Sequence, residues 1–265
     1  MEAVGELLHQ QPPPLPARPV APARWSLEHL RAACRWLADY SLSGVWRLLD
    51  AWNFSYKRGR RYTHSPDPDY QAKRDYARGC VAAARATYPR VVALYLDEFT
   101  YYRQPSLASD WAERGARQQP LAASGYTSDK RRRVVATLDS VSGRVIYEQA
   151  WKVGVRRLAA FYPCLRAAYP EAEVIYVVQD NWPIHFWPEV GQAARAAGVE
   201  LVTLPTYAPW LNPIEKLWRK LRQEVLHLHR LGDDWRGLQQ RVADFLDGFA
   251  AGSTPLLRYV GLLPN

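Results

Sequence analysis

Two runs of consecutive apolar residues, each followed by an aspartate, most constrain how this chain folds. Val91–Leu96 ends directly before Asp97, and Val174–Val178 is followed by Gln179 and then Asp180. A run without polar alternation suits a strand that is buried on both faces of a sheet. Because an open α/β sheet presents ligands at the carboxyl ends of its strands, we expect Asp97 and Asp180 to lie close together at one edge.

The rest of this region alternates strands and helices. Arg132–Leu138 and Arg144–Trp151 flank the turn residues Ser140–Gly143, which predicts a hairpin, and Glu200–Leu204 predicts another strand. Helical spacing of apolar residues predicts helices at about 155–168, 189–197, 213–228 and 234–250. Together these elements indicate an α/β fold with one mixed sheet flanked by helices.

The N-terminal part has a different character. Residues 1–24 contain many prolines, and we expect a flexible leader without a fold. Residues 25–65 predict two short helices joined by a polar turn and followed by a basic arm, which is typical of a small all-α helix-turn-helix module; a plain helical hairpin fits the same spacing. Residues 66–90 predict a connecting helix, and we expect residues 91–265 to form the α/β domain.

Basic residues gather in two bursts within a chain whose net charge is +9. Such bursts are typical of a partner with many phosphates, because each neutralised phosphate releases counterions. Ordinary solvated surface charge is the alternative explanation. The candidate DNA-binding residues are Lys57, Arg58, Arg60, Arg61, Lys130, Arg131, Arg132 and Arg133.

Neither cysteine spacing nor hydropathy indicates a secreted or membrane protein. Cys34, Cys80 and Cys164 are widely separated, so we expect no disulfide framework and no zinc knuckle. No apolar run approaches the roughly 20 residues that span a bilayer, and the N-terminus lacks the pattern of a secretory signal. We therefore expect a cytoplasmic location.

Glu215 is the third candidate ligand beside Asp97 and Asp180. It lies at the start of a helix, on the shoulder of that helix's apolar stripe, where it can reach the sheet edge. Three converging carboxylates repel one another unless cations are present. Mg²⁺ takes one or two carboxylates per ion together with phosphate oxygens, so three carboxylates fit two ions in a catalytic site for phosphodiester substitution.

Purely structural readings of these residues are open as well. Asp180 can close a strand with an Asx-turn. Asn212 as N-cap, Pro213 at the first helical position and Glu215 three residues after the cap resemble a capping box. His185 lies in an aromatic stretch and fits a packed side chain.

Three local sequences make the assignment more specific. They are Leu96-Asp97-Glu98-Phe99, the segment Gln179 to His185 (QDNWPIH), and the segment Leu204 to Trp218 (LPTYAPWLNPIEKLW). These segments resemble the three catalytic blocks of DDE superfamily endonucleases, and in particular the insertion-sequence transposases related to the mariner group. Ser41 to Arg61 resembles the second of that group's two N-terminal helix-turn-helix units.

The resemblance implies a ribonuclease-H-like catalytic domain in which Asp97, Asp180 and Glu215 are catalytic and hold two Mg²⁺ ions, with Mn²⁺ as a substitute. Asn181, His185 and Asn212 are the supporting residues that it indicates. It also implies cleavage of double-stranded DNA at element ends and strand transfer into a target, at TA, by a homodimer or higher assembly. Bacterial, nucleoid-associated localisation follows from the same resemblance.

The chain departs from this group at its start, because a Pro-rich leader stands where the first helix-turn-helix unit is expected. End recognition by a separate N-terminal DNA-binding chain would fit that difference. Two other functions remain open at this stage. One is a truncated, transposase-derived DNA-binding protein or regulator without catalysis, and the other is a ribonuclease-H-like nuclease that acts on hybrids or branched DNA.

Overall fold

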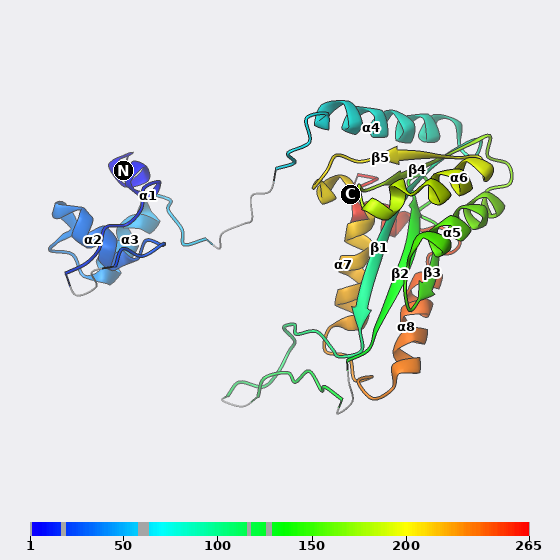
Figure 1. Ribbon diagram of the computed structural model, residues 1–265. Helices are drawn as coiled ribbons and strands as arrows, with labels where there is room; N and C mark the ends of the chain where they lie inside the picture. The colour runs from blue at the N-terminus through cyan, green and yellow to red at the C-terminus, as the bar shows by residue number, and fades with distance from the viewer. Residues whose placement is uncertain (1, 17–19, 58–63, 116–117, 126–128, 265) are drawn as a thin grey trace. The chain divides into compact units, whose positions relative to one another are not determined.

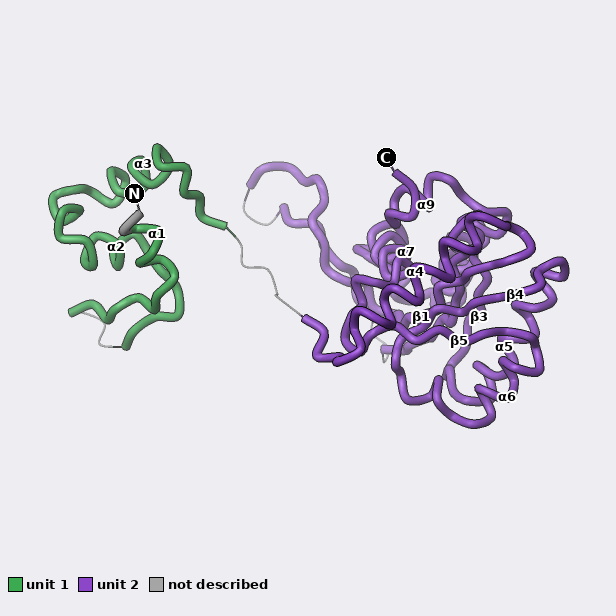
Figure 2. Tube along the Cα trace, turned by 90° about the horizontal axis from the view of Figure 1, so that it is seen from above, with its two compact units in different colours: residues 1–62 green, residues 63–265 purple. Residues whose placement is uncertain are grey.

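The computed structural model describes residues 2–16, 20–57, 64–115, 118–125 and 129–264. The chain divides into two compact units, residues 1–62 and residues 63–265 (Figure 2). Each unit has its own apolar core, so they are described separately.

The first unit is helical. Its elements are α1 (Glu2–Leu8), α2 (Leu27–Ala33), the 3-10 turn η1 (Arg35–Leu37) and α3 (Leu42–Ala51). Serine caps begin both later helices: Ser26 accepts a hydrogen bond from the His29 N–H, and Ser41 accepts one from the Gly44 N–H. Each cap satisfies a backbone N–H group in the first turn of its helix, which stabilises the starts of α2 and α3.

The expectation of a leader without a fold is wrong for its first residues. Helix α1 lies within residues 1–24, and its Val4 is fully buried against Leu30, Leu37 and Val45. The prolines follow this helix rather than interrupt it, so Val4 can pack into the apolar core of the unit.

The second unit is built on one five-stranded sheet (Figure 1). Its strands run in the order β3-β2-β1-β4-β5. β1 pairs antiparallel with β2 and parallel with β4, β2 pairs antiparallel with β3, and β4 pairs parallel with β5. The bounds are β1 Val91–Tyr102, β2 Arg131–Asp139, β3 Val145–Ala150, β4 Val174–Gln179 and β5 Val199–Thr203.

Strand β1 is longer than the sequence suggested, and this changes the place of Asp97. The apolar run ends at Leu96, but the strand continues to Tyr102 because β2 pairs with it along this length, Asp97 opposite Ala136. Pairing with β4 stops at Tyr95, opposite Val178. Asp97 therefore lies inside a strand rather than after it, yet still beside the carboxyl end of β4.

Helices cover both faces of the sheet. One face packs on α5 (Val155–Ala168) and α6 (Pro188–Ala196), and the other packs on α4, α7, α8 and α9. α7 (Ile214–Leu221) continues into a π-helical segment, Arg222–Leu226, before α8 (Trp235–Asp247) and α9 (Thr254–Val260). Phe99 of β1 stacks on Trp218 of α7 with ring centroids 5.2 Å apart, which fixes α7 against the strand that carries Asp97.

Helix α4 (Tyr70–Thr87) is part of this unit rather than a free connector. Its residues Ala77, Cys80, Val81 and Ala84 are buried in the same core as α7 and α8. The three cysteines are unpaired. Among the described residues, no helix combines the length and the apolar character needed to cross a membrane.

Candidate active site

A cavity of about 470 Å³ opens beside the carboxyl end of β4. Asp97, Asp180 and Glu215 all line it, although they come from β1, from the residue after β4 and from the first turn of α7. The remaining lining residues are Asn181, Trp182, Pro183, Leu204, Pro205, Thr206, Tyr207, Ala208, Pro209 and Asn212. The fold thus brings the three predicted carboxylates to one cavity.

Asp97 is the carboxylate whose charged form the protein stabilises least. The Trp218 indole N–H donates to its Oδ2 at 2.8 Å. Burial, followed by the charges of Glu215 and Glu98, nevertheless raises the pKa of Asp97 to about 8. Such a carboxylate is stabilised in its charged form when a cation comes near it.

Asp180 has the opposite environment. Its side chain is 55% exposed, and the Trp182 N–H donates to Oδ1 at 2.9 Å. This Asx-turn forms as the structural reading predicted, and Asp180 also lines the cavity. Burial alone would raise the pKa of Asp180, but hydrogen bonds from His185 and Trp182 hold it below its usual value.

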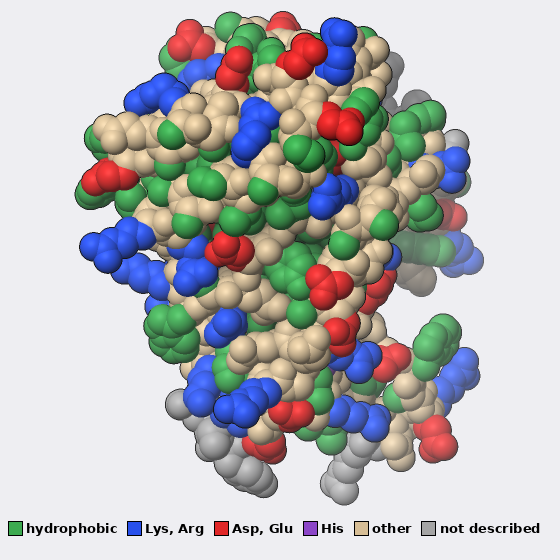
Figure 3. All heavy atoms as spheres, turned by 90° about the vertical axis from the view of Figure 1, so that its right-hand side faces the viewer, with side chains coloured by type: hydrophobic (Ala, Val, Ile, Leu, Met, Phe, Trp, Pro, Cys, Tyr) green, Lys and Arg blue, Asp and Glu red, His purple; other side chains and the backbone are tan. Residues whose placement is uncertain are grey.

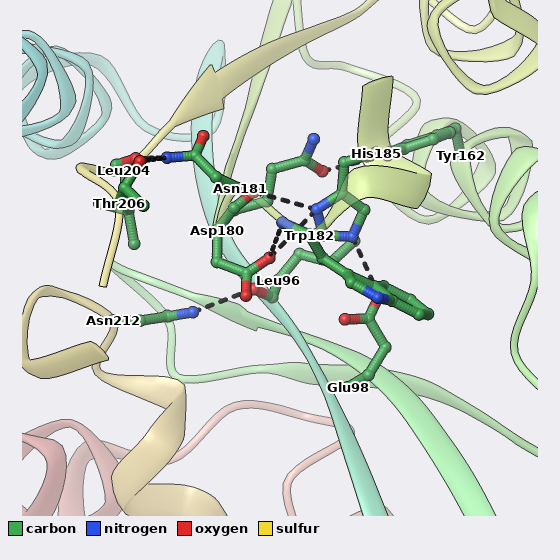
Figure 4. Close-up of polar contacts among 11 residues, drawn as sticks. Leu96, Glu98, Tyr162, Asp180, Asn181, Trp182, His185, Leu204, Thr206 and Asn212 are labelled. Carbon is green, nitrogen blue, oxygen red and sulfur yellow. Dashed lines mark hydrogen bonds and ion pairs between the residues drawn. The ribbon is translucent and has the colours of Figure 1, made fainter. Parts of the chain in front are cut away.

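His185 contacts both Glu98 of β1 and Asp180, which directly follows β4 (Figure 4). Its Nε2 lies 3.1 Å from Glu98 Oε1, and its Nδ1 lies 3.1 Å from the Asp180 carbonyl oxygen and 3.3 Å from Asp180 Oδ1. Burial lowers the pKa of His185, but the hydrogen bonds to Asp180 and Glu98 outweigh burial and raise it to about 10. The imidazolium therefore fixes Asp180 electrostatically from a fully buried position.

Glu215 projects from α7, and Asn212 fixes the start of that helix. The Asn212 side chain does not cap the helix; instead its Nδ2 donates to the Leu96 carbonyl oxygen at 3.1 Å. This bond ties the chain entering α7 to the residue before Asp97, so the capping-box reading is wrong. Desolvation, then the charge of Asp180, raises the pKa of Glu215 against the opposing charges of Arg222 and Arg219.

Asn181 supports the other wall. Its Nδ2 donates to the Leu204 carbonyl oxygen at 2.9 Å and to Thr206 Oγ1 at 2.8 Å. The amide thereby joins the residue after Asp180 to the loop that follows β5. Asn181, His185 and Asn212 thus each contact the backbone or side chain of a cavity residue or its neighbour.

The donor set suits hard divalent ions. Asn212 Oδ1 is buried, lines the cavity and has no hydrogen-bond partner in the described structure. Among the described residues, no three His, Cys, Asp or Glu side chains close around a single point. Carboxylate and carbonyl oxygens are the kind of ligand that suits Mg²⁺ and Mn²⁺.

Of the predicted DNA-binding residues, Lys130 to Arg133 are not among the residues that line this cavity. Lys130 and Arg131 are exposed at the start of β2, and Arg132 donates to the Gln149 carbonyl oxygen at 3.3 Å. On the face shown in Figure 3, Lys and Arg side chains are interspersed with acidic ones. Lys57 is exposed in the first unit, whereas Arg58, Arg60 and Arg61 lie outside the described residues.

Family profiles match both parts of the chain. The profile described as "DDE superfamily endonuclease" matches residues 92–236, which is more than half of the chain. The chain belongs to the DDE superfamily of endonucleases. A second profile, "Winged helix-turn helix", matches residues 22–74.

Two relatives carry the names of mobile elements. The chain is 23% identical over 228 residues to the "Insertion element IS630 uncharacterized 39 kDa protein" of Shigella sonnei, covering 85% of this chain and 64% of that protein. It is 29% identical over 130 residues to the "Transposable element Tcb2 transposase" of Caenorhabditis briggsae, covering 46% of this chain and 43% of that protein. The chain thus spans less than two thirds of the length of either relative.

Solved structures of Mos1 share the fold of this DDE superfamily member. A Mos1 mariner paired end complex with Mn matches with a TM-score of 0.64 and 17% identity, covering 92% of this chain and 77% of that chain. The Mos1 Strand Transfer Complex matches with a TM-score of 0.63 and 18% identity, covering 92% and 76%. The ribonuclease-H-like sheet preceded by a winged helix-turn-helix module is therefore confirmed.

Sequence reasoning missed several residues that shape this site. Glu98 was quoted only as part of a motif, although its carboxylate holds His185. Trp218 was quoted only as the last residue of a motif, although its N–H donates to Asp97. Asp67 was not singled out in the sequence, yet it accepts a hydrogen bond from the Thr206 N–H. Of these residues, only Glu98 could have been suspected from the sequence, because it is an acidic residue directly beside Asp97.

Proposed function

We propose that this chain is the catalytic part of a DNA transposase. It cuts double-stranded DNA at the ends of a mobile element and transfers the ends into target DNA, at TA, as a homodimer or higher assembly. The observation that carries this proposal is the single cavity lined by Asp97, Asp180 and Glu215. Membership of the DDE superfamily and the names of the relatives support it.

Asp97, Asp180 and Glu215 would hold two divalent ions, Mg²⁺ or Mn²⁺. Mos1 structures with a similar fold were solved as complexes with Mn or with Mg, which supports this choice of metals. When bound, such ions activate the attacking water or 3′-hydroxyl and stabilise the leaving oxygen. Trp218 orients Asp97, His185 orients Asp180, and Asn212 anchors the helix that carries Glu215. The side chains are therefore held in place before DNA arrives, which lowers the reorganisation needed in the reaction.

DNA binding itself would rest on residues outside the cavity. Lys130, Arg131, Arg132 and Arg133 lie at one end of β2, and Lys57 belongs to the winged helix-turn-helix module with its neighbours Arg58, Arg60 and Arg61. These side chains would neutralise backbone phosphates. A separate DNA-binding chain is a further candidate partner for reading the element ends.

The test is cleavage of labelled duplexes from the DNA that flanks the gene, with Mg²⁺ or Mn²⁺. Asp97→Asn should lower the cleavage rate by at least about 100-fold, because it removes a charged group that acts in the transition state. DNA affinity should change less than twofold, since the basic residues lie elsewhere. Asp110→Asn, an exposed carboxylate outside the cavity, is the matched control and should cleave like the native chain.

Tight DNA binding by the native chain without any metal-dependent cleavage would contradict this function. It would favour a regulator derived from a transposase instead. Cleavage that survives Asp97→Asn would show that the phosphodiester chemistry takes place elsewhere.

A further inference from the structure

Tyr207 occupies an unusual position at the cavity. Its side chain is 74% exposed and lines the cavity, and its backbone has a φ of 53°. Only two other described residues besides glycine, Asn53 and Leu228, have positive φ, and neither lines the cavity. Glycine adopts this conformation freely, whereas a tyrosine is strained in it. Strain of this kind persists where the surrounding structure enforces it, and it is concentrated at functional sites.

Thr206, the residue before Tyr207, forms hydrogen bonds through its backbone N–H, its carbonyl oxygen and its hydroxyl group. The Thr206 N–H donates to Asp67 Oδ2 at 2.8 Å, its carbonyl oxygen accepts from Ser65 Oγ at 2.5 Å, and its Oγ1 accepts from Asn181 Nδ2 at 2.8 Å. Two of these partners come from the segment before α4, and the third adjoins Asp180. These bonds fix the backbone that enters the strained residue.

Asp67 is the centre of this arrangement. Its side chain is only 2% exposed, and its Oδ2 also accepts from Lys73 Nζ at 2.8 Å, while Oδ1 accepts from the Asp69 N–H at 2.9 Å. The Lys73 hydrogen bond, then the Thr206 N–H, hold the pKa of Asp67 well below its usual range. The carboxylate is therefore charged and fully engaged whenever the chain is folded.

The far end of the same loop is tied as well. Trp210 Nε1 donates to the hydroxyl of Tyr70, at the start of α4. The loop is thus anchored on both sides of Tyr207, while the Tyr207 ring itself stays exposed. A rigidly presented aromatic ring beside an acidic cavity has the chemistry to stack on a nucleic-acid base, because every base offers a flat π-face.

We propose that Tyr207 binds DNA by stacking on a base next to the scissile phosphate, and that Asp67 is the positioning residue that holds it there. This inference rests on the proposed function and adds a contact to it. It assigns base contact to the cavity, whereas the basic residues at β2 are proposed to contact backbone phosphates.

The first experiment measures stacking without catalysis. Duplexes from the DNA that flanks the gene carry 2-aminopurine at successive positions of one end, and Ca²⁺ replaces Mg²⁺ to hold back cleavage. The native chain and Tyr207→Phe should quench one position, and Tyr207→Ala should restore its fluorescence and weaken affinity about tenfold. Tyr76→Ala, which removes a ring that is 58% exposed on α4 outside the cavity, is the control and should behave like the native chain.

The second experiment measures the role of Asp67. Hydrogen exchange at the Thr206 amide should become faster in Asp67→Asn, and 2-aminopurine quenching should fall to a value between the native chain and Tyr207→Ala. Ser65→Ala, which removes one bond to the same residue, should shift both readouts in the same direction by less. Asp75→Asn, an exposed carboxylate that pairs with its neighbour Arg74, should shift neither.

The outcomes separate this inference from the proposed function. Equal quenching and affinity for Tyr207→Ala and the native chain would overturn the stacking contact, even if the native chain cleaves DNA. Native exchange at Thr206 in Asp67→Asn would overturn the positioning role. A native chain that shows the Tyr207-dependent quenching but never cleaves would contradict the proposed function alone, and one that binds no duplex would contradict both.

Discussion

The two aspartates of this site were both predicted as metal ligands, and they lie in contrasting regions of the structure. The Asp97 region, on β1 against α7, is desolvated and has a neutral N–H as its side-chain donor, and the pKa of Asp97 rises to about 8. The Asp180 region, at the end of β4, contains a buried imidazolium and an Asx-turn, and the pKa of Asp180 falls. The charged form of Asp97 would need a bound cation to stabilise it, whereas Asp180 already has the His185 imidazolium beside it.

This difference suggests a division of labour. The Asp180 region keeps its geometry without metal because His185 joins Glu98 and Asp180 through three contacts. We propose that a bound metal ion would stabilise the Asp97 region, because burial and the charge of Glu215 make deprotonation of Asp97 unfavourable without a cation. The predictions below test whether the two regions differ in this way.

The largest effect on stability is expected from His185→Ala. It leaves the Glu98 carboxylate, whose side chain is 11% exposed, without its partner, and we expect the free energy of unfolding to fall by on the order of 3 kcal/mol. Chemical denaturation measures this change. His9→Ala, at an exposed histidine of the first unit, should leave stability unchanged. An equally small effect for His185→Ala would remove the contrast between the two regions.

A smaller effect of opposite sign is expected from Asp97→Asn in metal-free buffer. The folded pKa of about 8 lies above the unfolded value of 3.8, so the native chain binds the proton more tightly when folded and loses stability as the pH rises from about 4 to 8. The asparagine variant lacks this loss. At pH 8 the variant should therefore melt at a higher temperature than the native chain, by about 2–4 °C for each kcal/mol of difference in the free energy of unfolding. At pH 4 the two should melt at similar temperatures.

Mn²⁺ should reverse that order at pH 8. Metal that binds only the folded native chain stabilises it by mass action, and the variant gains less. Thermal unfolding with and without Mn²⁺ measures both effects. If the native chain melts at a higher temperature than Asp97→Asn in metal-free buffer at pH 8, the charged form of Asp97 does not destabilise the folded chain.

The smallest effect is expected from Trp218→Phe. The phenyl ring can keep the stacking on Phe99, but the N–H donor to Asp97 is lost. Because that donor partly lowers the pKa of Asp97, its loss should leave more Asp97 protonated at pH 7 and weaken Mn²⁺ binding by about threefold to tenfold, equivalent to roughly 1 kcal/mol. Calorimetric titration measures the affinity, and Trp151→Phe, at an exposed tryptophan of another segment, is the control.

The sheet could be predicted from sequence because its strands carry strong local signals. Val174–Gln179 and Val155–Ala168 were placed within one residue of their bounds, since apolar runs and helical spacing dominate there. The length of β1 could not be predicted, because its second half is a strand only through pairing with β2. Long-range pairing has no signature in a local window of residues.

The site shows the same limit. The three carboxylates carried a signal because Asp97 follows an apolar run, Asp180 follows a predicted strand, and Glu215 lies at the start of a predicted helix. The side chains that set their charge, Trp218, Glu98 and His185, act through contacts between residues far apart in sequence, such as the 121 positions that separate Trp218 from Asp97. The role of Asp67 depends likewise on a bond across 139 positions.

The most direct test of the central claim is a crystal structure of the native chain soaked with Mn²⁺, with anomalous scattering used to locate the ions. The account predicts anomalous peaks in the cavity, in contact with Asp97 and with Asp180 or Glu215, and their loss in Asp97→Asn. Ordered Mn²⁺ bound elsewhere, with none at these carboxylates, would contradict it.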